Sequence, residues 1–178
     1  LLDVLKQNGK ENSSREKLIA LLPGSRDQEI NKILPVMLGV TKYFKNYQFT
    51  ICAAPSKNKS FYKKFMQGGD YKNVDIVNDQ TYNILGRSSA ALVTSGTATL
   101  EAALIKTPQI VCYKSSWISI IIGKFLLRNL KFISLVNLIL DKMAVKELIQ
   151  DDLNTKNIIE ELEIILSKDG KDKLIGYY

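Results

Sequence analysis

Histidine is absent from this sequence of 178 residues, and its absence excludes several kinds of catalytic site. A Ser-His triad, a zinc site with imidazole ligands and a histidine general base all need that side chain. Cysteine is scarce: Cys52 and Cys112 lie in the apolar stretches "FTICAA" and "QIVCYK", without the spacing of a metal site. We therefore expect two buried, reduced thiols in a cytosolic protein.

The chain also shows no signal peptide and no initiator methionine, because it begins Leu-Leu-Asp. From this beginning we expect a fragment or a processed chain. A hydrophobic content of 46% and a charged content of 24% are ordinary for a globular protein, and the length suits one well-filled core. We expect a single domain over residues 1–178.

Acidic residues are scarce in one long part of the chain. The net charge is +7, and from Lys106 to Lys146 seven basic residues stand against a single acid, Asp141. A basic surface attracts phosphates, anionic lipids or nucleic acids without choosing between them. The alternative is a solvated basic face that binds no partner.

Short apolar runs alternate along the chain with longer helical stretches, which is typical of βαβ units. The pattern predicts strands over residues 17–22, 47–54, 74–78, 90–94 and 109–114. It predicts helices over residues 27–44, 56–67, 81–87, 97–106, 116–128, about 142–150 and 154–168, with a short extended piece at 132–135. The predicted fold class is therefore α/β, a Rossmann-like parallel sheet with helices on both faces.

Ligands of such sheets bind outside the carboxyl ends of the strands, where the strand-to-helix loops meet. One of these loops contains "LPGSR", at residues 22–26. Gly24 permits a close approach of the backbone, Ser25 offers a hydroxyl and a helix cap, and Arg26 suits a bidentate phosphate contact. The alternative is a plain helix cap with a solvent-facing arginine. Neither the P-loop pattern nor G-x-G-x-x-G is present.

A second loop on the same edge, "TSGTATLE" at residues 94–101, has a similar composition. The amides and hydroxyls of Thr94, Ser95, Gly96 and Thr97 suit an anion. Glu101 follows one helical turn later. A carboxylate binds phosphate poorly, but it accepts hydrogen bonds well from two neighbouring sugar hydroxyls. Two such turns on one edge predict a site for a nucleotide diphosphate.

Four stretches carry a family resemblance by their order and spacing: "LLPGSRDQEI", "LVTSGTATLEAAL", "PQIVCYK" and "FISLVNLI". Together they resemble the lipid-A-disaccharide synthases, which are glycosyltransferases of family 19 with the GT-B fold. The resemblance covers about residues 17–168 and concerns only the C-terminal half of these enzymes, the domain that binds the UDP-sugar. These enzymes transfer a hexosyl group from UDP-2,3-diacylglucosamine to 2,3-diacylglucosamine 1-phosphate. They thereby form lipid A disaccharide 1-phosphate and UDP in lipopolysaccharide biosynthesis.

The resemblance also implies roles for single residues. The donor's phosphates would face Gly24, Ser25, Arg26, Ser95, Gly96 and Thr97, and Glu101 would hold the ribose. Arg26 and Asn137 are the catalytic candidates, although Val136 stands where these enzymes often have proline. Val77 and Asn78 are expected to contact the uracil through their backbone.

An inverting transfer needs a stabilised diphosphate leaving group. Arginine and amide donors supply this stabilisation, so we expect neither a metal nor another cofactor. The transfer also needs a base for the acceptor hydroxyl. In the resembled enzymes the N-terminal domain supplies this carboxylate and binds the lipid acceptor, and we expect that domain to be missing here. We therefore expect the chain to bind UDP or its sugar donor without turnover.

Residues 117–135, "WISIIIGKFLLRNLKFISL", are apolar, but Lys124, Arg128 and Lys131 make them a poor bilayer span. They suit either a helix packed on the domain or a face at a membrane surface. The resemblance implies a cytoplasmic protein bound peripherally to the inner face of the bacterial inner membrane, on its anionic surface. The sequence has no recognised nucleic-acid motif, and we expect no nucleic-acid partner.

Two alternatives stay open. Other UDP-sugar enzymes of the GT-B fold, such as UDP-N-acetylglucosamine 2-epimerase and the peptidoglycan N-acetylglucosaminyltransferase, share the Gly/Ser-rich turn and the glutamate that follows it. A non-enzymatic α/β module that binds anionic lipid or RNA would explain the basic charge.

Overall fold

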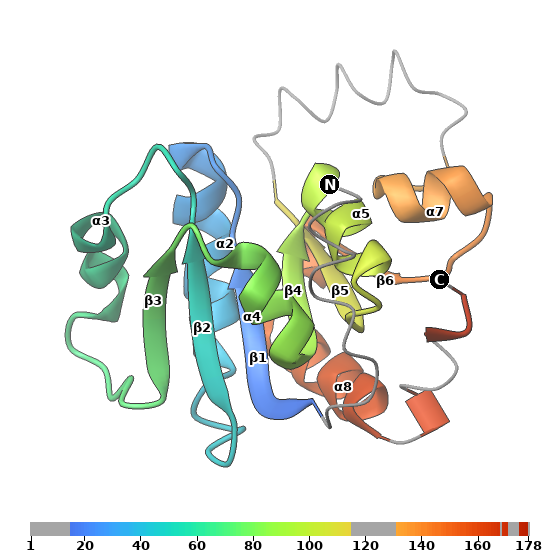
Figure 1. Cartoon of the computed structure of the whole chain (residues 1–178). Helices are drawn as coiled ribbons and strands as arrows, with labels where there is room; N and C mark the ends of the chain where they lie inside the picture. The colour runs from blue at the N-terminus through green and yellow to red at the C-terminus, as the bar shows by residue number, and fades with distance from the viewer. Residues whose placement is uncertain (1–14, 115–130, 168, 171–174, 178) are drawn as a thin grey trace.

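The computed structural model describes residues 15–114, 131–167, 169–170 and 175–177 (Figure 1). These residues contain a six-stranded sheet in the order β3-β2-β1-β4-β5-β6, and every neighbouring pair of strands is parallel. The strands are β1 (Glu16–Leu22), β2 (Gln48–Ala53), β3 (Val74–Asn78), β4 (Ser88–Thr94), β5 (Gln109–Tyr113) and β6 (Lys146–Ile149). The α/β class predicted from the sequence is confirmed.

Six α-helices and two 3-10 helices have both ends within the described residues. The α-helices are α2 (Asp27–Gly39), α3 (Lys59–Lys63), α4 (Thr81–Arg87), α5 (Thr97–Leu104), α7 (Leu135–Leu140) and α8 (Thr155–Leu166). The 3-10 helices are η1 (Lys64–Met66) and η2 (Gln150–Asp152).

The strand order reverses between β1 and β4, which lie side by side although β2 and β3 separate them in the sequence. Leu22 lies opposite Val93, so the two strands end at the same level. The loops that follow them therefore leave the sheet next to each other. In open α/β sheets, ligands bind at such a reversal point.

Alternate residues of β1 are buried on opposite faces of the sheet, as the strand period of two requires. Ile19 and Leu21 belong to the core that includes residues of α2 and α8, whereas Ala20 and Leu22 belong to the core that includes residues of α4 and α5. In Figure 1, α4 lies in front of the sheet and α2 behind it. Both faces are thus covered, and this explains why the central strand β1 is continuously apolar and buried from Leu18 to Leu22.

The predicted helix over about 142–150 is wrong. This segment contains β6, which pairs in parallel with β5 from Lys146, opposite Ile110, to Ile149, opposite Tyr113. Pairing with β5 outweighs the local preference of so short a segment. A helix instead covers residues 135–140, and it begins where Ser134 Oγ accepts a hydrogen bond from the amide of Asn137 at 3.3 Å.

Other helices differ from the prediction mainly at their ends. α2 ends at Gly39 instead of residue 44. A Cβ atom at Gly39 would lie 2.7 Å from Thr155 Oγ1, so the end of α2 touches the start of α8. The helix predicted over 56–67 is divided between α3 and η1. The helix predicted over 116–128 lies outside the described residues.

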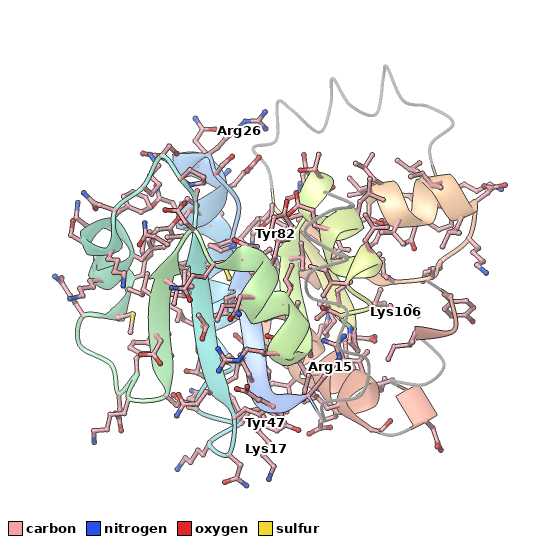
Figure 2. All side chains as sticks on the ribbon, in the orientation of Figure 1. Arg15, Lys17, Arg26, Tyr47, Tyr82 and Lys106 are labelled. Carbon is pink, nitrogen blue, oxygen red and sulfur yellow. The ribbon has the colours of Figure 1, made fainter. Side chains whose placement is uncertain are left out.

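Arg15 joins the C-terminal ends of α4 and α5, at the lower end of these helices in Figure 2. Its Nη1 donates to the carbonyl oxygens of Leu85 and Ser88 at 3.0 and 2.8 Å. Its Nη2 donates to those of Ile105 and Lys106 at 3.0 and 2.9 Å. A cation at this place also opposes the negative end of each helix dipole. Arg15 therefore fixes α5 from the end opposite to the predicted site.

Both cysteines are free and buried, as predicted. Burial raises the pKa of the Cys52 thiol to about 12, although a hydrogen bond with Thr81 acts in the opposite direction. Burial also raises the pKa of Cys112. Because the thiolate is the reactive form, neither side chain is poised to act as a nucleophile.

Candidate functional site

The turn between β1 and α2 lies against the end of β4. Gly24 has a φ of +100°, in the left-handed region that favours glycine. A Cβ atom at this position would lie 2.9 Å from Glu29 Oε2 and 3.4 Å from Thr94 Cγ2. The absence of a side chain at Gly24 thus allows the first predicted turn to approach the second, and the structure brings the two turns together.

Arg26 stands at the start of α2 with its side chain 82% exposed. Its Nη1 donates to Glu29 Oε1, 3.1 Å away in the first turn of the helix. Figure 2 shows Arg26 at the upper end of α2 in this view. Ser25 is not the cap: Arg26 holds that position, and no described side chain caps α2. An anion beside the guanidinium can therefore also reach the first amides of the helix.

The turn between β4 and α5 is built around Gly96. This residue has a φ of +146° and a ψ of −163°, a conformation that L side chains rarely adopt. Thr99 Oγ1 donates to the Gly96 carbonyl at 2.8 Å and so fixes the turn. Thr97 is exposed, and in the described part of the chain no side chain caps α5. The first amides of α5 are therefore the natural donors to an anion here.

The two hydroxyl groups before Gly96 differ in their hydrogen-bond partners. Ser95 Oγ donates to the carbonyl of Ile133 at 3.1 Å, so its hydrogen is not offered to an anion in this structure. Thr94 is 4% exposed, and its Oγ1 has no hydrogen-bond partner among the residues that the structure describes. A buried polar group without a partner costs about 1–3 kcal/mol. This unsatisfied hydroxyl lies where the two turns meet.

Glu101 lies one helical turn into α5 and is partly exposed. Tyr82 of α4 lies near enough to be affected by its charge. Burial raises the pKa of the Tyr82 hydroxyl, and the negative charge of Glu101 adds to this effect. A carboxylate and a phenol together offer an acceptor and a donor to sugar hydroxyls. The sequence pattern does not identify Tyr82, because only the packing of α4 beside α5 brings it near Glu101.

Asn137 is fully buried, and its whole amide group is used inside the protein. Its Oδ1 accepts hydrogen bonds from the backbone amides of Ala144 and Val145 at 2.8 and 2.9 Å. Its Nδ2 donates to the Val145 carbonyl and to Glu147 Oε1, both at 2.8 Å. The structure thus directs the amide of Asn137 toward β6 and the loop before it.

Val77 and Asn78 lie at the carboxyl end of β3, the edge strand that β2 separates from β1. Asn78 Nδ2 donates to the carbonyl of Lys57 at 3.3 Å and so holds the loop after β2. Lys57 in turn forms an ion pair with Asp27 in the first turn of α2. Sequence analysis does not identify Lys57, a second cation on the edge that carries Arg26.

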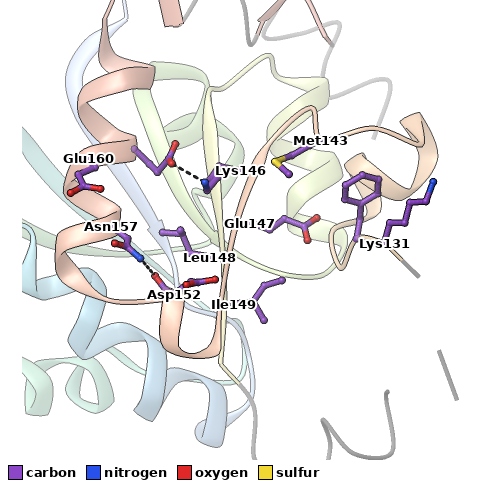
Figure 3. Close-up of a pocket in the computed structure, with 11 residues that line it drawn as sticks. Lys131, Met143, Lys146, Glu147, Leu148, Ile149, Asp152, Asn157 and Glu160 are labelled. Atoms are coloured by element: carbon purple, nitrogen blue, oxygen red, sulfur yellow. Dashed lines mark hydrogen bonds and ion pairs between the residues drawn. The ribbon is translucent and has the colours of Figure 1, made fainter. Parts of the chain in front are cut away.

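A pocket of about 380 Å³ lies away from these turns, between β6 and α8 (Figure 3). Its lining combines Lys131 and Lys146 with the carboxylates of Glu147, Asp152 and Glu160. Lys146 forms an ion pair with Glu161 at 3.1 Å. We do not assign the nucleotide to this pocket, because β6 is the edge strand and β5 separates it from β4.

Three further features bear on the metal and membrane predictions: the possible metal ligands, the length of the helices and the basic residues of the apolar stretch 117–135. Within the described ranges, no group of three His, Cys, Asp or Glu residues lies close enough to hold a metal ion. No helix in the same ranges is both long and apolar enough to span a bilayer. Of the three basic residues that interrupt the apolar stretch 117–135, Lys131 is exposed, whereas Lys124 and Arg128 lie outside the described residues.

Solved structures with the same fold include two sugar-nucleotide proteins. UDP-GlcNAc 2-epimerase from Neisseria meningitidis, bound to UDP-GlcNAc, has a TM-score of 0.59 and 17% identity, over 99% of this chain and 43% of that chain. ADP-heptose LPS heptosyltransferase II of E. coli has a TM-score of 0.57 and 12% identity, over 92% of this chain and 50% of that chain. At these identities the likeness shows the GT-B-type fold alone.

Sequence comparison identifies the family. The family model for lipid-A-disaccharide synthetase matches residues 1–175. The lipid-A-disaccharide synthase of Syntrophus aciditrophicus is 37% identical over 161 residues, which are 88% of this chain and 42% of that protein. That of Francisella tularensis subsp. novicida is 34% identical over 151 residues, 82% of this chain and 40% of that protein.

The chain thus spans about two fifths of the length of the curated relatives that it matches. The match nevertheless covers almost every residue of the chain and includes both turns at the reversal of the strand order. The chain belongs to the lipid-A-disaccharide synthase family.

Proposed function

We propose that this chain is the donor-binding half of a glycosyltransferase that acts in lipid A biosynthesis. The donor would be UDP-2,3-diacylglucosamine and the acceptor 2,3-diacylglucosamine 1-phosphate, with lipid A disaccharide 1-phosphate and UDP as products. The observation that carries the proposal is the contact of the two turns: Gly24 and Thr94 approach each other where the strand order reverses. Family membership favours this function over the epimerase, the peptidoglycan transferase and a non-enzymatic module.

In this proposal the diphosphate lies between the starts of α2 and α5. Arg26 and the first amides of α5 bind its oxygens and stabilise the charge that develops as the glycosidic bond breaks. The exposed guanidinium of Arg26 must reorient from Glu29 to do so, and the exposure of this ion pair makes that change inexpensive. Another domain supplies the base for the acceptor hydroxyl, so the chain alone binds donor without turnover.

Glu101 is proposed to accept hydrogen bonds from the ribose hydroxyls, beside Tyr82. The test compares UDP with 2′-deoxy-UDP by calorimetry. Because one hydroxyl–carboxylate bond is worth about 1.5 kcal/mol or more, wild-type protein should prefer UDP by about tenfold. Glu101→Ala should bind both nucleotides equally and more weakly.

Glu160→Ala is the control, since Glu160 is an exposed carboxylate of α8 that lines the other pocket. It should keep the wild-type preference. Absence of UDP binding by wild-type protein, or an unchanged preference in Glu101→Ala, would contradict the proposal. We also expect EDTA to leave UDP binding unchanged, because the proposal assigns the charge of the diphosphate to Arg26 and the amides.

We further propose a peripheral position on the cytoplasmic face of the inner membrane, where the lipid substrates reside. The charge excess from Lys106 to Lys146 supports it. Vesicles of phosphatidylglycerol should sediment the protein, whereas vesicles of phosphatidylcholine should not. The triple change of Lys124, Arg128 and Lys131 to Glu should abolish this binding. Equal binding to both kinds of vesicle would contradict the proposed position.

A further inference from the structure

Glu147 of β6 is the centre of a hydrogen-bond cluster that sequence analysis does not identify. Its Oε2 accepts from the amide of Ile133 at 2.9 Å. Its Oε1 accepts from the amide and the hydroxyl of Ser134, at 2.9 and 2.7 Å, and from Asn137 Nδ2 at 2.8 Å. Four donors on one partly buried carboxylate form a strong, charge-assisted contact. It fixes the segment that leads into α7 against the edge strand.

Asn137 of α7 is the second side chain that holds this cluster together. It joins α7 to the Ala144–Val145 backbone through its Oδ1 and Nδ2, and it adds one of the four donors to Glu147. All of its polar capacity is used within 10 residues of its own position, so it has none left for a substrate in this structure. Its place next to Glu147 indicates a supporting role.

Ile133 links this cluster to the turn between β4 and α5. Ile133 donates its amide to Glu147 and accepts, through its carbonyl, the hydroxyl hydrogen of Ser95 at 3.1 Å. Ser95 is the residue immediately before Gly96, the N-cap residue of α5. A displacement of residue 133 therefore acts directly on the turn whose amides are proposed to bind the diphosphate.

We propose that Glu147 is a positioning residue for the diphosphate site. It holds Ile133, and through Ile133 and Ser95 it holds the turn at Gly96 in the conformation that presents the amides of α5. Asn137 contributes to the same support through its bonds to Glu147 and to the Ala144–Val145 backbone. This inference rests on the proposed function only for its effect on UDP; the effect on the turn is a property of the protein alone.

Amide hydrogen exchange, followed by mass spectrometry, tests the first part. Gln at position 147 keeps the shape but loses the charge and one acceptor, so the bonds to the amides of Ile133 and Ser134 weaken. In Glu147→Gln, peptides covering 133–134 and 96–99 should exchange about tenfold faster than in wild type. Peptides of β1 and β2 should be unchanged.

Glu161→Gln is the matched control. It removes a carboxylate of the neighbouring helix α8, which pairs with Lys146 and makes no contact with residues 133–137 among the bonds described. Exchange at 96–99 should stay at the wild-type rate. Equal acceleration in both variants, or none in Glu147→Gln, would overturn the proposal.

Ser95→Ala tests whether the effect passes from Ile133 to the turn at Gly96. This test can be made even if Glu147→Gln does not fold. Removal of its hydroxyl should accelerate exchange at 96–99 and leave 133–134 protected, because the carboxylate still holds Ile133. Acceleration at 133–134 alone would overturn the proposal.

A compensating pair tests the role of Asn137. Asn137→Asp places two carboxylates in contact and should accelerate exchange at 96–99 about tenfold or more. Adding Glu147→Gln restores a donor between the two side chains, and at least half of the lost protection should return. A double variant no better than Asn137→Asp would contradict a role that acts through Glu147.

UDP affinity completes the test. In Glu147→Gln the Kd for UDP should rise about three- to tenfold, and Glu161→Gln should match wild type. If wild-type protein binds no UDP, the proposed function fails and exchange alone decides on the coupling. If UDP binds but Glu147→Gln changes neither exchange nor affinity, the coupling fails and the proposed function stands.

Discussion

The two turns at the reversal of the strand order meet the same edge of the sheet but are held in different ways. The turn after β1 ends in Arg26, which is 82% exposed and bonded to Glu29 within the same helix. The turn after β4 contains Ser95, whose hydroxyl donates a hydrogen bond to the carbonyl of Ile133, 38 positions later in the sequence. The first turn carries charge on a side chain that can move, and the second presents backbone amides in a fixed conformation.

In the proposed function, this difference gives the two turns separate tasks. The exposed guanidinium of Arg26 would supply affinity that depends on charge and weakens with salt. The amides of the second turn would supply geometry, because they need no rearrangement as charge develops on the leaving group. Substitution of Arg26 in the first turn should therefore alter UDP binding without altering the free energy of unfolding. Substitution of residues that hold the second turn in place should alter both.

The largest effect is expected at Arg15, which supports α5 from its far end. Arg15→Ala removes its bonds to five carbonyl oxygens at the ends of α4 and α5 and should lower the free energy of unfolding by about 2–3 kcal/mol. Urea unfolding measures the change. Arg15→Lys should recover little of it, because an ammonium group cannot reach both helices at once. Full stability in Arg15→Ala would show that α5 does not depend on this contact.

Arg26→Ala should separate binding from stability. Loss of a charge-assisted contact of about 1.5–3 kcal/mol should weaken UDP binding by about 10- to 100-fold and make the remaining affinity less sensitive to salt. Unfolding should be unchanged, since the side chain is exposed. Lys32→Ala removes the same charge from an exposed position of α2 and should leave UDP affinity within about twofold. A similar loss of UDP affinity in both variants would show that Arg26 acts only through its general positive charge and not through a specific contact.

Gly96→Ala tests the conformation of the second turn. Nothing lies within 4 Å of the added Cβ, so the cost of about 1–2 kcal/mol comes from the positive φ alone. Gly68→Ala is matched to it, because Gly68 also has a positive φ and open space around its Cβ position. Both variants should lose similar stability in urea unfolding, but only Gly96→Ala should weaken UDP binding. Loss of UDP binding in both would argue against a specific role of the second turn.

The smallest effect is expected at Glu16 and Arg87, whose side chains form a bidentate pair at the amino-terminal end of β1. The hydrogen bond with Arg87 lowers the pKa of Glu16. The pair therefore contributes stability above the ordinary pKa of glutamate, and this is lost as the pH falls through the lowered value. Both groups are half exposed, so Glu16→Gln should change unfolding by only about 0.5 kcal/mol or less. A change in UDP affinity in Glu16→Gln would show that the amino-terminal end of β1 is not independent of the proposed site at the two turns.

Much of the fold is predictable because the buried strands are short apolar runs between turn residues. Val74–Asn78 and Thr81–Arg87 have the predicted bounds. β6 is not predictable in the same way: "KELI" carries two charges, and its conformation comes from pairing with β5. The two turns are recognisable from local composition. The partners Tyr82, Lys57 and Glu147 are not, because their contacts join segments far apart in the sequence.

The most direct measurement is a titration of the isotope-labelled chain with UDP, followed by amide chemical shifts. We predict that the largest shifts occur together at residues 24–29 and 95–101, with smaller shifts at residues 133–134. Shifts centred on Lys146–Ile149 and on residues 157–161 would instead place the nucleotide in the pocket between β6 and α8. That result would contradict a diphosphate site at the two turns.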